Sequence, residues 1–193
     1  MSTELERGAV DALAERWRSA WEGSGFEACC TPDVTHGQLE PLAPDSLADR
    51  WVDAWLTGRF VPVCTVDIHY EDPAAREPLS GVGALESHSQ MLREAFPDLR
   101  LERTGPRIGD EHYACVPWRA AGTHQGQLAA LPGSNRFVTL HGVHFIELTD
   151  GRVHRARGFF DLYEAGIQLG LLPSRGSLGE TALLLLRGFG FRR

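Results

Sequence analysis

Residues 140–161 read LHGVHFIELTDGRVHRARGFFD, two runs of alternating side chains separated by Thr-Asp-Gly at 149–151. Side chains alternate between the two faces of a strand, and Asp-Gly is a typical pair for a tight hairpin turn. The stretch therefore predicts a β-hairpin with strands near 136–149 and 152–161. This hairpin is the clearest structural signal in the chain, and the rest of the fold is predicted around it.

The alternation separates the two histidines of the first hairpin strand. Residues three apart on a strand point to opposite faces, so His141 and His144 do not converge on one metal ion despite their H-x-x-H spacing. We therefore expect no metal site. If His144 faces the interior, the same parity groups one face of the second strand as His154, Ala156, Gly158 and Phe160. Small residues at 156 and 158 would leave room for a ligand beside His144.

Upstream of the hairpin, the pattern predicts helices first and further strands after them. Residues 81–96, GVGALESHSQMLREAF, carry apolar side chains at helical spacing and predict an amphipathic helix. Period-two alternation predicts strands near 98–108 and 112–125, with an earlier strand at 66–71. An antiparallel meander with one apolar face must cover that face with the helices. The prediction is an α+β fold, a cone-shaped barrel in which a curved mixed or antiparallel sheet wraps on N-terminal helices and encloses an internal pocket.

A repeat occupies the N-terminal third of the chain. Residues 12–33 and 46–67 are identical at ten of 22 aligned positions, including two tryptophans, a phenylalanine and a cysteine in each copy. Their spacing predicts an amphipathic helix, a glycine-containing turn and a shorter helix around the phenylalanine and cysteine. We interpret the second copy as the start of the domain. The chain then divides into a duplicated helical-hairpin extension over 1–43, a cone domain over 44–172, and a helical tail over 173–193 that packs on the domain or on a partner subunit.

Composition narrows the classes of function. The net charge is −7, and no basic cluster suits a nucleic-acid backbone. All 19 basic residues are arginine, which excludes a lysine Schiff base and a P-loop lysine. We expect a cytoplasmic protein with reduced thiols and no membrane partner. The four cysteines form no C-x-x-C pair, and the sequence shows no secretory leader and no apolar run that could span a bilayer.

Three stretches together resemble one known family. They are GVGALESHSQMLREAFPDLRLE at 81–102, AAGTHQGQL at 120–128, and the hairpin at 140–161. Over roughly residues 46–172 the chain is similar to the SnoaL-like polyketide cyclase branch of the nuclear transport factor 2-like superfamily. The resemblance implies an α+β cone with a buried pocket for an apolar small molecule, no cofactor, and a homodimer formed through the outer sheet face.

The resemblance also implies where acid–base residues would lie. In the aldol cyclases of this family, an aspartate on the last strand is the acid–base group, and a histidine on the preceding strand assists it. Carried over by position, the histidine matches His144 and the aspartate position falls at Gly158. Glycine cannot transfer a proton, so His144 becomes the main catalytic candidate, because an imidazole suits proton transfer near neutral pH. His124 is the second catalytic candidate, with a strand-end histidine near solvent as its alternative interpretation.

Other side chains are predicted to shape the pocket. Tyr70 is expected to face inward because His69 shares its own face with two acidic residues, although the opposite arrangement stays open. His88 lies on the apolar stripe of the helix at 81–96, either as a buried structural group or as a pocket residue. The predicted ligand-binding residues are Tyr70, His88, Met91, Trp118, Ala156, Gly158 and Phe160.

Three functions fit these observations. The first is an enzyme that cyclises or isomerises a polyketide-like or other apolar secondary metabolite by acid–base chemistry, without a cofactor. The second is a non-catalytic ligand-binding module whose acid–base aspartate is lost at Gly158. The third is an epoxide-opening hydrolase or cyclase of the same fold, although that chemistry uses paired pocket carboxylates that the sequence does not obviously supply.

Overall fold

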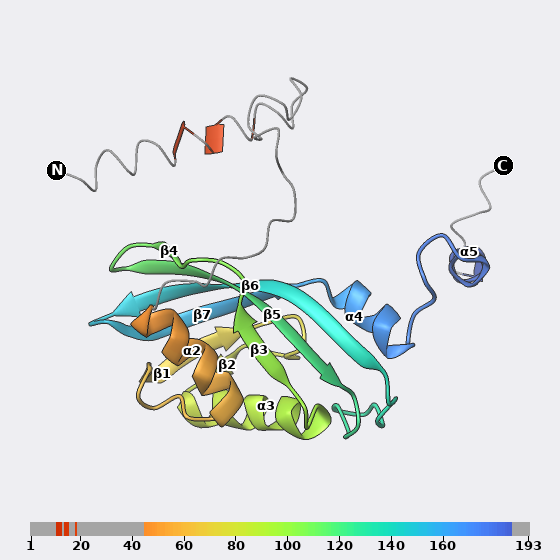
Figure 1. Ribbon diagram of the computed structural model, residues 1–193, viewed down its shortest axis with the longest axis horizontal. Helices are drawn as coiled ribbons and strands as arrows, with labels where there is room; N and C mark the ends of the chain where they lie inside the picture. Colours follow the sequence, from red (N-terminus) through yellow and green to blue (C-terminus); the bar gives the residue numbers. More distant parts are fainter. Residues whose placement is uncertain (1–10, 13, 16–17, 19–44, 187–193) are drawn as a thin grey trace. The chain divides into compact units, whose positions relative to one another are not determined.

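The hairpin predicted at residues 140–161 lies within the sheet of the computed structural model (Figure 1). Its strands are β6, Phe137–Thr149, and β7, Arg152–Phe160. The turn between them places Asp150 at φ 50° and Gly151 at φ 70°. Two consecutive left-handed residues are what a type I′ hairpin turn requires. The turn chemistry of the sequence is thus confirmed.

The hairpin belongs to a seven-stranded sheet of order β2-β1-β7-β6-β5-β3, with β4 paired to β5. The remaining strands are β1 Cys64–Glu71, β2 Leu79–Ser80, β3 Arg100–Arg103, β4 Ile108–Gly109 and β5 Tyr113–Thr123. All pairings are antiparallel except that of β1 with β7, which is parallel. The predicted antiparallel meander is confirmed for β5 to β7, and β1 makes the sheet mixed.

Two helices lie on the same side of this curved sheet (Figure 1). Helix α2 spans Ser46–Thr57, and the Asp45 side chain caps it by accepting from two backbone N–H groups. Helix α3 spans Val82–Ala95, close to the predicted range. Two later helices are α4, Leu162–Leu169, and α5, Leu178–Leu186. The chain is therefore an α+β fold with N-terminal helices on a curved mixed sheet, as predicted.

The core forms where α2 and α3 meet the inner face of the sheet. Trp51 and Phe60 are fully buried there, as are Ile68, Leu85 and Ile146. The predicted short helix around Phe60 and Cys64 is wrong. Cys64 is the first residue of β1 and pairs with β7, and only a hydrogen-bonded turn separates it from α2. Strand pairing satisfies the backbone groups of Cys64 next to the core, and Phe60 lies in the turn before it.

The structure describes residues 45–186 and positions 11, 12, 14, 15 and 18. The chain divides into two compact units, Met1–Pro41 and Leu42–Arg193. The sheet and helices α2 to α5 belong to the second unit. Most of the predicted first hairpin at 12–33, and the end of the tail at 187–193, lie outside the described residues. The three-part division of the chain stays a prediction. Within the described residues, no helix is long and apolar enough to cross a membrane.

Candidate functional site

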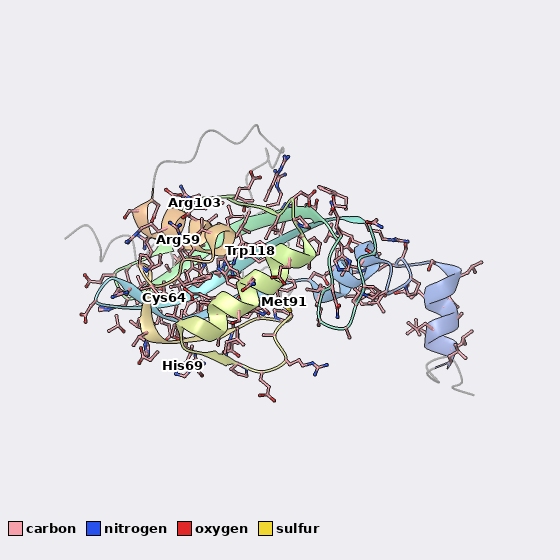
Figure 2. The ribbon with its side chains drawn as sticks, turned by 90° about the horizontal axis from the view of Figure 1, so that it is seen from below. Arg59, Cys64, His69, Met91, Arg103 and Trp118 are labelled. Atoms are coloured by element: carbon pink, nitrogen blue, oxygen red, sulfur yellow. The ribbon has the colours of Figure 1, made fainter. Side chains whose placement is uncertain are left out.

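An apolar pocket lies between the inner face of the sheet and helices α2 and α3. Its cavity volume is about 130 Å³. Figure 2 looks onto the helices and shows Trp118 between α2 and α3. The lining residues are Trp55, Tyr70, Asp72, Ala74, Leu92, Phe96, Leu99, Leu101, Trp118, Ala120, Ala121, Gly122, Val138, Leu140, His144 and Phe160. Of the predicted site residues, Tyr70, Trp118, His144 and Phe160 are in this lining.

The chemical feature of the pocket is the carboxylate of Asp72, a residue that directly follows β1. Its Oδ1 accepts hydrogen bonds from the backbone N–H groups of Ala74 and Ala75, both at 2.8 Å. Its Oδ2 accepts from the Tyr70 hydroxyl at 2.9 Å and lies 3.0 Å from Nε2 of His88. The carboxylate is thus almost enclosed and has donors on both oxygens.

Asp72 lies next to Gly158, the position that matches the acid–base aspartate of the family's aldol cyclases. A Cβ placed on Gly158 would lie 2.8 Å from the Tyr70 oxygen and 3.1 Å from Cβ of Asp72. The small residue at 158 therefore makes room for Tyr70 and Asp72, and the expectation that it makes room for a ligand is wrong. The signal that could have found Asp72 is parity, since it lies two residues beyond the inward-facing Tyr70.

The electrostatics of this cluster follow from burial and these hydrogen bonds. Burial disfavours the charged form of Asp72, but the His88 hydrogen bond and charge, with the other donors, outweigh it and hold its pKa below the ordinary value. Burial, and secondly the charge of Asp72, raises the pKa of Tyr70 well above its ordinary value. At neutral pH the pair is a carboxylate and a neutral phenol.

His144 is buried among aromatic rings. Its imidazole stacks on Trp55 with centroids 5.6 Å apart and lies 5.4 Å from the ring of Trp118. Nε2 is 3.3 Å from the Tyr70 oxygen, and Nδ1 has no hydrogen-bond partner among the described residues. Burial lowers the pKa of His144 to about 3, although the charge of Asp72 opposes this. His144 is therefore neutral near pH 7, far from the ordinary imidazole pKa on which its prediction as a general base rested.

Five predicted site residues lie outside the lining of this pocket. His88 faces Asp72, and Met91 is half-buried on α3, where Figure 2 labels it. Ala156 is buried in the core beside Tyr70 in the strand register. Gly158 lies behind the carboxylate cluster. The fifth residue, His124, directly follows β5.

His124 is completely buried, so its alternative interpretation as a strand-end histidine near solvent is wrong. Its Nδ1 accepts from the backbone N–H of Ser134 at 3.2 Å and lies 3.1 Å from the Ser134 hydroxyl. Its ring packs on Phe96, with centroids 5.2 Å apart. These contacts close the loop between β5 and β6. None of them involves Asp72 or its hydrogen-bond partners.

Comparison with known proteins identifies the architecture. The model of the SnoaL-like polyketide cyclase family matches residues 45–169. The chain is similar to a candidate SnoaL-like polyketide cyclase from Jannaschia sp. CCS1, with a TM-score of 0.58 and 18% identity over 71% of this chain and 100% of that chain. No curated protein matches the chain.

Two other solved structures share the fold. IdmH, a candidate polyketide cyclase from Streptomyces antibioticus, has a TM-score of 0.55 and 17% identity over 65% of this chain and 99% of that chain. A protein of ketosteroid isomerase-like fold from Catenulispora acidiphila, solved in complex with trimethylamine, has a TM-score of 0.57 and 11% identity over 67% of this chain and 95% of that chain. At these identities the likeness shows the fold alone.

Adding a side chain at position 158 should destabilise the protein. Gly158→Ala places a methyl group within 2.8 Å of the Tyr70 oxygen, and such overpacking costs about 1–3 kcal/mol. Gly158→Asp should cost more, because it adds a second carboxylate beside Asp72. Urea unfolding measures both changes. The control is Gly83→Ala, a helical position with open space around it, which should be neutral or stabilising.

The neutral state of His144 predicts a specific loss of stability in acid. Below about pH 6.5 the unfolded chain protonates this imidazole, whereas the folded protein resists protonation down to about pH 3, so the free energy of unfolding falls as pH decreases. Between pH 7 and pH 5 this contribution is about 2 kcal/mol. Urea unfolding at both pH values should show that His144→Gln removes it. His141→Gln, exposed on the same strand, should lose stability in acid as the wild type does; equal losses in all three proteins would contradict the assignment.

Proposed function

The chain belongs to the SnoaL-like polyketide cyclase family, and we propose that it cyclises or isomerises an apolar, polyketide-like molecule by acid–base chemistry in this pocket. The observation that carries the proposal is the Asp72 carboxylate in the wall of an otherwise apolar pocket, in contact with Tyr70. A carboxylate there supplies the proton acceptor that Gly158 cannot. We therefore assign the acid–base role to Asp72 in place of His144.

The hydrogen bonds of Asp72 constrain how it acts. A carboxylate offers about four lone-pair sites, and its donors are Ala74, Ala75, Tyr70 and His88. Oδ2 therefore accepts a substrate proton only after one donor leaves. Of the two donors to Oδ2, Tyr70 is the one that lines the pocket. In the proposed reaction its O–H turns to a substrate carbonyl oxygen, which frees Oδ2 for the neighbouring carbon-bound proton.

The remaining chemistry follows from that exchange. The electrons of the broken C–H bond form an enolate, and the Tyr70 hydroxyl donates a hydrogen bond to its oxygen. In a cyclisation the enolate carbon attacks a second carbonyl, whose oxygen then takes the proton that Asp72 received. In an isomerisation the protonated Asp72 returns its proton to a different carbon. His144 acts through Tyr70, since its neutral ring lies within hydrogen-bonding distance of the phenol oxygen.

The alternative functions have less support. The binding-module hypothesis rested on the missing aspartate at 158, but Asp72 brings a carboxylate to the same space. The epoxide-hydrolase hypothesis needs paired carboxylates, whereas Asp72 is the one acidic residue in the pocket lining that the structure describes. Acid–base chemistry on a carbonyl compound needs only the single carboxylate and the phenol.

The test is catalysed proton exchange on an apolar bicyclic ketone, β-tetralone. The protein in D₂O should accelerate deuterium incorporation next to the carbonyl, as followed by NMR. General acid–base groups contribute about 100-fold or more, so Asp72→Asn should reduce the rate by at least that factor. Asp67→Asn is the matched control, because Asp67 is an exposed aspartate on the outer face of β1, the strand that precedes Asp72.

The outcomes separate the hypotheses. An unchanged exchange rate in Asp72→Asn would sink the assignment of Asp72. Binding of β-tetralone without any exchange above background would favour the ligand-binding module. Loss of exchange in Asp72→Asn, with Asp67→Asn at the wild-type rate, would support the proposed enzyme.

We also propose that the outer face of the sheet pairs with a second copy of the chain. The strand register places Pro117, Val143 and Phe159 side by side on the face away from α2 and α3. Phe159 is 47% exposed, and the exposed Tyr113 stacks on Phe145 nearby. A contiguous apolar patch on a sheet face is typical of a protein interface.

Light scattering after size exclusion checks this expectation. The wild type should have the mass of a dimer. Phe159→Arg should shift it to the monomer, because it buries an unpaired charge in the interface. Val66→Arg is the control, since Val66 is an exposed apolar residue on β1 outside this patch. A monomeric wild type would contradict the proposal.

A further inference from the structure

The pocket lining that the structure describes contains a negatively charged side chain and no positively charged arginine. Among its lining residues in the described chain, Asp72 is the only one with a full charge, and there is no arginine. The arginines in the neighbouring strand register lie outside the lining: Arg103 pairs with Asp49, Arg119 pairs with Glu102, and Arg100, opposite Ala121, is exposed. A negative group on a ligand inside this pocket would therefore find no cation in its walls.

We infer that the pocket selects its ligands by charge, accepting uncharged or positively charged fused-ring compounds and rejecting their carboxylates. This inference rests on the pocket of the proposed function, but it does not depend on catalysis. It narrows the substrate class to compounds with a neutral oxygen function, such as a ketone or an ester, or with an amine at the end that meets Asp72.

Two physical effects act on an anionic ligand in this site. A carboxylate that leaves water for an apolar pocket loses its hydration, and here no donor cation replaces it. It also experiences the charge of Asp72, which burial strengthens because the local dielectric constant is low. Both effects weaken binding. A neutral ligand of the same shape avoids both.

A cationic ligand separates the two effects. Its dehydration costs free energy as that of the anion does, but the Asp72 carboxylate attracts it. The aromatic faces of Trp55 and Trp118 lie in the same lining and favour a cation over a neutral group. Selection by the charge of Asp72 therefore predicts tight binding of the cation and weak binding of the anion, whereas dehydration alone would weaken both.

Three isosteric probes test the inference, each with one substituent at the same position of naphthalene: the methanol, the carboxylate and the methylammonium. Calorimetric titration at about pH 8 measures the three affinities. In the wild type the carboxylate should bind at least about tenfold more weakly than the alcohol. The ammonium should bind at least as tightly as the alcohol.

Asp72→Asn tests the cause, with its fold checked by circular dichroism. In this variant the carboxylate and the ammonium should bind within about threefold of each other, and both more weakly than the alcohol, because only the cost of dehydration is left. Asp67→Asn should keep the wild-type order. Equal weakness of both ions in the wild type would overturn the assignment to Asp72, and so would a carboxylate that binds as well as the alcohol. These comparisons within the wild type need no variant. In the wild type, β-tetralone exchange without the charge order would refute only this inference, whereas the charge order without exchange would refute only the proposed catalysis.

Discussion

The buried carboxylate of Asp72 is the interaction on which the site depends. A charge in an apolar interior is stable only when its hydrogen bonds are satisfied, and here the donors come from three places. Tyr70 is on β1, Ala74 and Ala75 follow that strand, and His88 is on α3. The carboxylate therefore ties the end of a strand to a helix. The glycine at 158 is a consequence of this arrangement, because a Cβ there would collide with the phenol that Asp72 holds.

Burial also determines which of the ionisable groups carries a charge. Enclosure by Trp55 and Trp118 keeps His144 neutral, so its ring orients the phenol without holding a charge. Asp72 stays ionised because its donors compensate for its dehydration. Asp72 is then the charged group in a pocket lining that is otherwise mostly hydrocarbon, and His88 contacts it from outside that lining. The proposed chemistry and the proposed ligand choice both depend on this carboxylate, since a low dielectric constant strengthens every interaction with its charge.

Local patterns predicted most of the elements. Alternation located β5, β6 and β7, and helical spacing located α3 within one residue at each end. The failure at Phe60 and Cys64 has a clear cause. Those residues resemble a helix locally, but β7 offers a strand edge beside Cys64, and pairing with that edge outweighs a weak helical preference. The parallel pairing of β1 with β7 is also a tertiary outcome, because the two strands are far apart in the sequence.

The sequence by itself predicted the α+β class and the strands that carry Tyr70, Trp118 and His144, because these follow from periodicity, which is a local property of the chain. Which face Tyr70 presents to the pocket was left open by the sequence. Only the tertiary structure decided which group holds the charge. Asp72, His88 and Gly158 lie on three different elements, and no spacing in the sequence shows that they meet. Proton affinity depends on burial and on hydrogen-bond partners, and both are set when distant segments pack together.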